Sequence, residues 1–187
     1  MPDIDIDFAN RDEILKVVKH RIATLDTKAK HNTGVYVTEI PHDPLTLKST
    51  IDYKEAEDRG YFKLDFLNVS LYKHIRDLTH LSELQERKPL WELLGHKEFT
   101  DGLFHIAGHH ELCQKLQPKS VIELAAVLAI IRPGKRYLAD KTWPEIHAEV
   151  WKKPEDGSYY FKKSHAVSYA VAVIVHMNLL VEILANE

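Results

Sequence analysis

Three aspartates alternate with apolar residues at the start of the chain, in the stretch PDIDIDF. Asp3, Asp5 and Asp7 are spaced two apart, and a β-strand places residues with this spacing on one face. Like charges held so close are destabilising unless a cation or basic groups balance them. Carboxylate oxygens are preferred ligands of Mg²⁺. The pattern therefore indicates either a divalent-metal site or an edge strand with a solvated acidic face.

A second alternating stretch, YFKLDFLNV, carries another carboxylate. Lys63 and Asp65 share one face of this predicted strand, and apolar residues form the other face. If the two strands are neighbours in one sheet, Asp3, Asp5 and Asp65 converge. Such a trio suits two-metal phosphoryl transfer, in which two Mg²⁺ ions bridge the attacking and leaving oxygens. Lys63 then either binds a phosphate or neutralises the acidic cluster.

The elements that must position these carboxylates form a small α/β part, which we place at residues 1–68. NRDEILKVVKHRIATLD has the periodicity of an amphipathic helix that includes Ile22, with Asn10 or Asp12 at its N-cap. Gly34 opens a short β-rich run that Pro41 ends. An acidic helix or turn ended by Gly60 precedes the second strand.

Residues 69–187 have helical patterns. SVIELAAVLAIIRPG predicts a helix with Ser120 and Glu123 as a capping box, and residues 135–160 are predicted to be irregular. A long helix is expected to begin near Lys163 or Ser164. Its apolar run AVSYAVAVIVHMNLLVEILA is interrupted by polar residues, which favours a buried helix over a membrane span. The interrupting residues are Ser168, His176, Asn178 and Glu182.

The composition is that of a globular protein. The chain has 187 residues, 44% hydrophobic and 28% charged, with one cysteine. The net charge of −3 provides no global basic field for nucleic acid. We expect a cytoplasmic protein without a membrane span, and any nucleic-acid site must rely on local lysines or on metals.

His105, His109 and Cys113 recur every four residues, which on one helix would be a possible zinc-binding face. Gly108 interrupts the turn between the two histidines. The spacing therefore favours ordinary surface or core positions over a zinc site.

Five motifs in sequence order resemble the bacterial DNA polymerase III α subunit, the family C replicative polymerases. PDIDIDF resembles the PDxDxDF motif of that family, and YFKLDFLNV resembles its K-x-D-F-L-G-L segment. KHNTGVYV is similar to the H-x-x-G-V-V strand. TDGLFHIAGHHELCQKLQPKSVIELAAVLAIIRPG is similar to the F-Q-x-x-S region with the following helix and R-P-G, and FKKSHAVSYA to F-N-K-S-H-A-x-x-Y-A. The motifs span nearly the whole chain.

The resemblance implies an α+β fold: a partial polymerase-β-like nucleotidyltransferase palm, with a small sheet and a helix, followed by a mainly α-helical fingers-like part. It assigns catalysis and metal binding to Asp3, Asp5 and Asp65, with Asp7 in a supporting role. It also implies a set of nucleotide-binding residues. These are Lys63, Arg132, Lys163, Ser164, His165 and Tyr169.

The chain also departs from the family pattern. The Gly-Ser element that cradles the triphosphate has no counterpart before PDIDIDF, and only about twenty residues stand where the family has a helical thumb. Asn68 replaces the glycine of K-x-D-F-L-G-L, and Lys162 replaces the asparagine of F-N-K-S-H. These departures predict a strongly truncated protein whose exposed sheet edge pairs with a second polypeptide.

The expected function is metal-dependent nucleotidyl transfer to a DNA 3′ end by a miniature or split family C polymerase. The expected cofactor is two Mg²⁺ ions, for which Mn²⁺ can substitute. The expected partners are primer-template DNA, a dNTP and either a second polypeptide that completes the palm or a replisome protein. Two alternatives stay open: an inactive palm-fingers remnant from a phage or mobile element that binds DNA or a replisome protein, and a two-metal nuclease.

Overall fold

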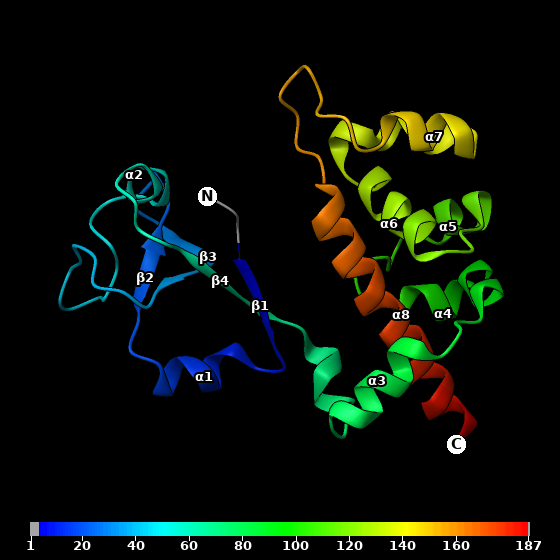
Figure 1. Ribbon diagram of the computed structural model, residues 1–187, viewed down its shortest axis with the longest axis horizontal. Helices are drawn as coiled ribbons and strands as arrows, with labels where there is room; N and C mark the ends of the chain where they lie inside the picture. Colours follow the sequence, from blue (N-terminus) through cyan, green and yellow to red (C-terminus); the bar gives the residue numbers. More distant parts are fainter. Residues whose placement is uncertain (1–3, 187) are drawn as a thin grey trace. The chain divides into compact units, whose positions relative to one another are not determined.

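The computed structural model describes residues 4–186 and divides into two compact units between His74 and Ile75 (Figure 1). The strands lie in the first unit and the second is helical, which confirms the predicted α+β class. The division falls six residues after the expected boundary at 68. The intervening 3₁₀ helix η1 (Ser70–His74) belongs to the first unit, and the Val69 amide just before it donates to the Phe8 carbonyl at 2.8 Å.

A four-stranded mixed sheet organises the first unit. Its strands are β1 (Ile4–Phe8), β2 (Arg21–Thr24), β3 (Lys30–Tyr36) and β4 (Leu64–Asn68), in the order β1-β4-β3-β2. β1 and β4 are parallel, whereas β3 is antiparallel to both of its neighbours. β1 is therefore an edge strand of the sheet.

The helix predicted over residues 10–26 is much shorter than expected. α1 (Arg11–Val17) is capped by Asn10, which accepts from the Asp12 amide. The chain then returns as β2, and its pairing with β3 buries Ala23 and Thr24. This tertiary burial overrides the helical spacing that includes Ile22.

Asn68 links α1 to the sheet. Its Oδ1 accepts from the Arg11 amide at 2.7 Å, one of the helix N-terminal N–H groups that lack an intrahelical partner. The Arg11 guanidinium donates to the Asn32 carbonyl of β3. Asn68 therefore ties the start of α1 to β4.

The rest of the first unit carries the short helix α2 (Tyr53–Asp58), whose N-cap Asp52 accepts from the amides of Lys54 and Glu55. Ala56 of α2 packs with Ala23 and Tyr36 of the strands in a small core. The predicted acidic helix before Gly60 is confirmed.

The second unit consists of short helices around one long helix. Their bounds are α3 (Leu78–Glu86), η2 (Trp91–Gly95), α4 (Lys97–Asp101), α5 (His110–Leu116), α6 (Val121–Ile130), η3 (Pro133–Asp140), α7 (Trp143–Glu149) and α8 (Lys163–Ala185). The segment 135–160, expected to be irregular, thus contains most of η3 and all of α7. The capping box of Thr142 and Glu145 and a proline near the helix start account for α7.

The predicted start of α8 near Lys163 is confirmed, and α8 packs against α6 and α3 (Figure 1). By length and composition alone α8 could cross a membrane, but its Ala170, Val173 and Met177 are buried in the core of the second unit. The predicted capping box of α6 is only half formed. Ser120 accepts from the Glu123 amide, whereas the Glu123 carboxylate accepts from the Lys119 amide.

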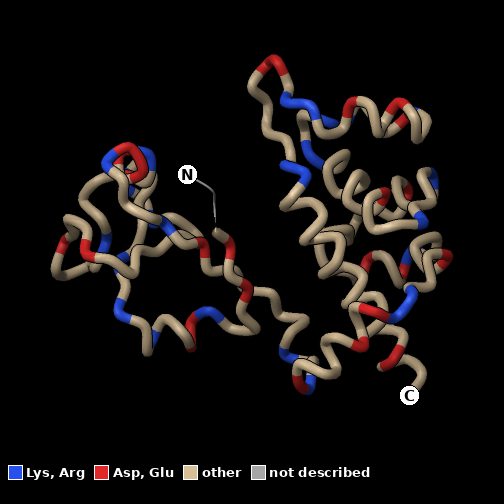
Figure 2. Tube along the Cα trace, viewed as in Figure 1, with Lys and Arg blue, Asp and Glu red and all other residues tan. Residues whose placement is uncertain are grey.

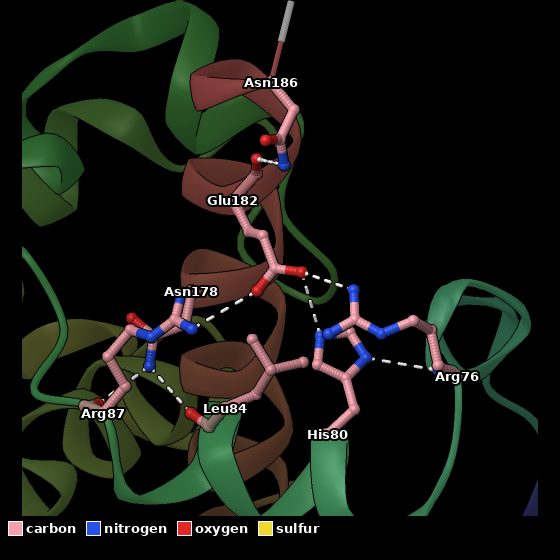
Figure 3. A network of polar contacts seen from close by, with 7 residues as sticks. All are labelled: Arg76, His80, Leu84, Arg87, Asn178, Glu182 and Asn186. Atoms are coloured by element: carbon pink, nitrogen blue, oxygen red, sulfur yellow. Dashed lines mark hydrogen bonds and ion pairs between the residues drawn. The ribbon is translucent and has the colours of Figure 1, made fainter.

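Two of the polar residues that interrupt the apolar run of α8, Asn178 and Glu182, bind neighbouring elements (Figure 3). The Asn178 amide donates to the carbonyls of Leu84 and Arg87 at 2.8 Å each, at the C-terminal end of α3. Glu182 accepts from Arg76 at 2.9 Å and from Arg87 at 3.3 Å. The Asn178 contacts thus join α8 to carbonyls at the end of α3 that the helix cannot satisfy itself, and the Glu182 ion pairs hold the residues on either side of α3.

Candidate functional site

Asp5 and Asp65 occupy paired positions of the parallel β1–β4 ladder. Neighbouring strands are about 4.8 Å apart, and paired residues of a parallel ladder lie on the same face. The two carboxylates therefore share one face of the sheet. Figure 2 shows acidic residues along β1. The predicted juxtaposition of the two strands is present. Asp3, the third predicted ligand, lies outside the described residues.

The Asp65 carboxylate is almost buried, with 9% of the residue exposed. It forms an ion pair with Lys63 through Oδ2. The Thr33 hydroxyl donates to Oδ1 at 2.6 Å, and His31 Nδ1 lies 3.8 Å from the same oxygen. Side chains from β3 and from the residue just before β4 thus hold Asp65 in a fixed orientation.

The protonation of His31 follows from its contacts. Its Nδ1 accepts from the Gly34 amide at 2.9 Å, which requires an unprotonated Nδ1. Burial lowers the pKa of His31, and the nearby Lys63 ammonium lowers the pKa further. A neutral His31 adds no second full positive charge beside Asp65.

Gly34 provides the space that Lys63 occupies. A Cβ on Gly34 would lie 2.8 Å from Lys63 Cδ and 3.0 Å from both Ala23 Cβ and His31 Nδ1. Gly34 pairs with Asp65 across the β3–β4 ladder. The lysine stem therefore crosses β3 at the one position without a side chain.

Asp7 extends the acidic face by two residues. Burial raises the pKa of Asp7, the hydrogen bond from Tyr72 lowers the pKa, and the Asp5 charge raises it again. The Tyr72 hydroxyl lies 3.4 Å from Asp7 Oδ2. The repulsion between the Asp5 and Asp7 carboxylates would be reduced by a cation at this face.

The donor set of this face fits a hard divalent cation. Asp5 and Asp65 supply carboxylate oxygens from adjacent strands, and Mg²⁺ is usually held by one or two carboxylates with water and substrate oxygens. The described residues contain no group of three His, Cys, Asp or Glu side chains arranged around one point. A metal would accordingly be held here by two described carboxylates, with Lys63 displaced from at least one oxygen of Asp65.

Three of the predicted nucleotide-binding residues lie around Phe161 in the second unit. The Arg132 guanidinium lies 5.1 Å from the centre of the Phe161 ring. The Tyr169 and His165 rings lie 5.4 Å and 6.4 Å from it. The Arg132 Nε is buried without a hydrogen-bond partner among the described residues.

His105 lies against the same cluster. Its ring is 4.3 Å from that of Tyr169 and 3.8 Å from that of Phe104. Burial lowers the pKa of His105 to about 4, with the Arg132 charge as a second cause. His105 is therefore neutral near pH 7.

Lys163 and Ser164 form the first turn of α8, which has no side-chain cap. The Ser164 carbonyl accepts from the Ser168 hydroxyl at 3.1 Å. The N-terminal amides of a helix attract anions, which is consistent with the role that the resemblance implies. Ser164 is not the N-cap, because Lys162 holds that position.

The residues considered for zinc do not share one helix face. His105 has φ 64° and precedes Gly108 with φ 78°, and α5 begins only at His110. Cys113 is buried, and burial raises the pKa of its thiol to about 11. A protonated, buried thiol is a poor metal ligand.

Sequence patterns did not identify the residues that orient Asp65 or Arg132. His31, Thr33 and Gly34 lie in the segment KHNTGVYV that supported the resemblance, and Phe161 opens FKKSH. Their place in these motifs is the one sequence signal that points to these residues. Which of their side chains contacts Asp65 depends on the pairing of β3 with β4.

Comparisons with known proteins add no relative: no family model, curated protein or solved structure matches this chain.

Proposed function

We propose that this chain catalyses metal-dependent transfer of nucleotides to a DNA 3′ end, as a miniature or split relative of the family C polymerases with a partial palm and helical fingers. One observation carries the proposal: Asp5 and Asp65 are register partners on one sheet face, with Lys63 on the same face. The motif resemblance assigns these three positions to metal and phosphate binding.

Each residue of the first unit has a specific part in this proposal. Asp5 and Asp65 hold the Mg²⁺ ions together with Asp3. Bound Mg²⁺ supplies charge stabilisation at the attacking and leaving oxygens. Thr33 and His31 keep Asp65 oriented, and Lys63 binds a phosphate oxygen once a cation takes over its charge balance with Asp65.

The second unit supplies nucleotide contacts in the proposal. Arg132, Lys163 and the start of α8 bind phosphates, and Tyr169 and His165 contact the nucleotide near Phe161. A cation and helix N-terminal amides are the usual donors to phosphate.

Primer extension tests the proposal directly. Purified chain is incubated with a labelled primer-template, dNTPs and Mg²⁺ or Mn²⁺, and Asp5→Asn and Asp65→Asn are compared with Asp58→Asn, an exposed carboxylate of α2. Extension that both site variants lose by about 100-fold or more, and that Asp58→Asn keeps, is the expected result. Extension that survives both site substitutions would refute the proposed site.

The Lys63–Asp65 ion pair specifically favours a second candidate, an inactive palm-fingers remnant that binds DNA or a replisome protein. An Asp65 neutralised by a lysine is stable without any metal. Calorimetric titration with Mg²⁺ or Mn²⁺ separates the two: binding that Asp5→Asn and Asp65→Asn abolish favours the polymerase. Shortening of the labelled primer instead of extension would favour the two-metal nuclease.

The edge position of β1 supports a partner chain. β1 pairs only with β4 among the described strands, and Ile4 is 40% exposed. An exposed strand edge accepts a further strand through its backbone groups. We propose that a second polypeptide pairs here to complete the palm. Extension assays with and without proteins encoded nearby test this, and full activity of the chain alone would exclude the requirement.

A further inference from the structure

The loop between α7 and α8 packs closely against Gly134 of the second unit. The Gly134 amide donates to the Tyr159 carbonyl at 3.0 Å. A Cβ on Gly134 would lie 2.7 Å from that carbonyl oxygen, 2.8 Å from Ser158 Oγ and 3.1 Å from Pro154 Cγ. The contact holds the backbone around Tyr159 against the start of η3, and only glycine fits there.

Tyr137 lies on the same side of η3. It follows Gly134 by three residues, and residues i and i+3 of a 3₁₀ helix eclipse each other because there are three residues per turn. Tyr137 is 58% exposed and Tyr159 is 63% exposed. Two large, mostly exposed aromatic side chains therefore arise from neighbouring backbone positions.

A buried lysine anchors the Tyr137 ring. Lys135 is 2% exposed, and its ammonium lies 5.9 Å from the centre of that ring. The same ammonium donates to the Glu149 carbonyl at 2.7 Å, which fixes it to the end of α7. One side of the phenol ring is thus supported by the protein while most of the residue faces solvent.

The surrounding segment is basic although the whole chain is acidic. Residues 132–163 contain eight lysines and arginines against five aspartates and glutamates, whereas the chain carries a net charge of −3. Figure 2 shows basic residues in the loop before α8 and at the start of α8, among others in the second unit. Lys153, in the same loop as Tyr159, forms no ion pair within the described residues. Cations beside exposed aromatic rings are the combination that binds single-stranded nucleic acid.

We propose that Tyr137 and Tyr159 form a stacking platform for single-stranded DNA, on which bases of the unpaired template lie while Lys153 and its neighbours contact the phosphates. The assignment to the template rests on the proposed function. The stacking itself does not require catalysis, since every base has a π-face that an aromatic ring can cover.

The test measures oligonucleotide binding without chemistry. Fluorescence anisotropy of a labelled oligothymidylate of about 12 nucleotides is followed in EDTA, at several salt concentrations. Tyr137→Leu, Tyr159→Leu and the double variant are compared with Tyr137→Phe and Tyr159→Phe, which keep the ring and remove the hydroxyl. Leu184→Ala removes an apolar side chain of similar exposure (60%) elsewhere in the same unit and serves as the control.

The expected result is binding weakened by about 5- to 100-fold for each leucine variant and unchanged for the phenylalanine and Leu184→Ala variants. Leucine variants that bind like the parent, phenylalanine variants that bind as weakly as leucine, or a parent that does not bind the oligonucleotide would each overturn the platform. Circular dichroism and the Tm of each variant show that it is folded.

Two further arms separate this inference from the proposed function. Asp5→Asn and Asp65→Asn are expected to keep oligonucleotide binding while they lose primer extension. A parent that binds single-stranded DNA through the tyrosines but never extends a primer would contradict the polymerase and keep the platform. Primer extension by Tyr137→Leu and Tyr159→Leu that equals extension by the parent would contradict the platform alone. An oligouridylate competitor tests DNA against RNA, and stronger competition by RNA would overturn the assignment to a DNA template.

Discussion

Asp5 and Asp65 face the same side of a parallel ladder, but their surroundings differ sharply. Asp65 is almost buried and held by Lys63 and Thr33, whereas Asp5 lies on the exposed edge strand. A cation bound at this face would therefore meet one nearly buried carboxylate and one on the exposed edge strand.

Replacing Lys63 with methionine is expected to destabilise the first unit by about 1–3 kcal/mol, because the nearly buried Asp65 carboxylate loses its charge partner. Mg²⁺ should restore part of the loss by replacing the missing positive charge. Thermal unfolding with Mg²⁺ and with EDTA measures both effects. Lys30→Met, at an exposed position of β3, is the control. A Tm of Lys63→Met that responds to Mg²⁺ no more than the parent's would contradict cation binding at Asp65.

Gly34→Ala is expected to cost about 1–3 kcal/mol, because the new Cβ would lie 2.8 Å from Lys63 Cδ and force the lysine to move. Part of this cost should disappear in a Lys63→Ala background, where the stem is absent. The residual cost there reflects Ala23 and His31. A double-mutant cycle from urea unfolding gives the coupling energy. Additive free energies would show that Gly34 and Lys63 do not compete for the same space.

Asp7→Asn is expected to stabilise the protein near neutral pH by about 0.5 kcal/mol. The pKa of Asp7 is raised in the folded state, by burial first and with a contribution from the Asp5 charge. The folded protein therefore binds this proton more tightly than the unfolded chain does, and the parent loses stability as the pH rises through the folded pKa. The advantage of Asp7→Asn should vanish at about pH 3, where both states are protonated.

Tyr72→Phe provides the matched control for Asp7. It removes the hydrogen bond that lowers the Asp7 pKa. Tyr72→Phe should therefore lose more stability than the parent does between acid and neutral pH. Urea midpoints at a series of pH values measure both variants. Identical pH profiles for the parent, Asp7→Asn and Tyr72→Phe would contradict the role assigned to Asp7.

Local patterns predicted the elements that depend on local residues. The α+β class, the two alternating strands, the Asn10 cap and the start of α8 all follow from spacing and capping within a few residues. α7 also has a local signal, since Thr142, Pro144 and Glu145 are adjacent in sequence. This local signal lies between residues rich in Lys and Tyr, whose composition favours an irregular segment.

Elements that depend on distant pairing were not predictable in the same way. Residues 21–24 have helical spacing in sequence, and only the pairing with β3 makes them a strand. His31 and Thr33 approach Asp65 because β3 is the antiparallel neighbour of β4. The same reason applies to Asn68, whose contact with Arg11 joins residues 57 apart. Such partners follow from the sheet order, which one sequence does not specify.

Asn178→Leu is expected to destabilise the second unit by about 2 kcal/mol. The substitution keeps a similar volume, but it leaves the carbonyls of Leu84 and Arg87 without their donor at the end of α3 (Figure 3). Asn178→Asp should be at least as damaging, since a carboxylate accepts rather than donates. Chemical unfolding followed by circular dichroism measures both. Stability equal to the parent's in Asn178→Leu would show that water satisfies these carbonyls.

His105→Gln is expected to reduce the acid sensitivity of the protein. Burial lowers the pKa of His105 to about 4, below its ordinary value of 6.5. Between pH 6.5 and 4 the unfolded chain therefore binds a proton at His105 that the folded protein does not bind. The free energy of unfolding falls as the pH decreases through this interval. Since His105 is partly exposed, the loss is on the order of 1–2 kcal/mol. Glutamine does not titrate, so the variant should lose that much less stability over the same interval.

A control for His105→Gln replaces a histidine that is exposed instead of packed against aromatic rings. His96 is an exposed residue before α4, and its side chain makes no capping hydrogen bond, so His96→Gln serves as the comparison variant. Titration of the His105 ring by NMR gives the second readout, with a midpoint near pH 4. A midpoint near 6.5, or equal pH profiles for His105→Gln and His96→Gln, would show that the contacts with Phe104, Tyr169 and Arg132 do not desolvate the imidazole in solution.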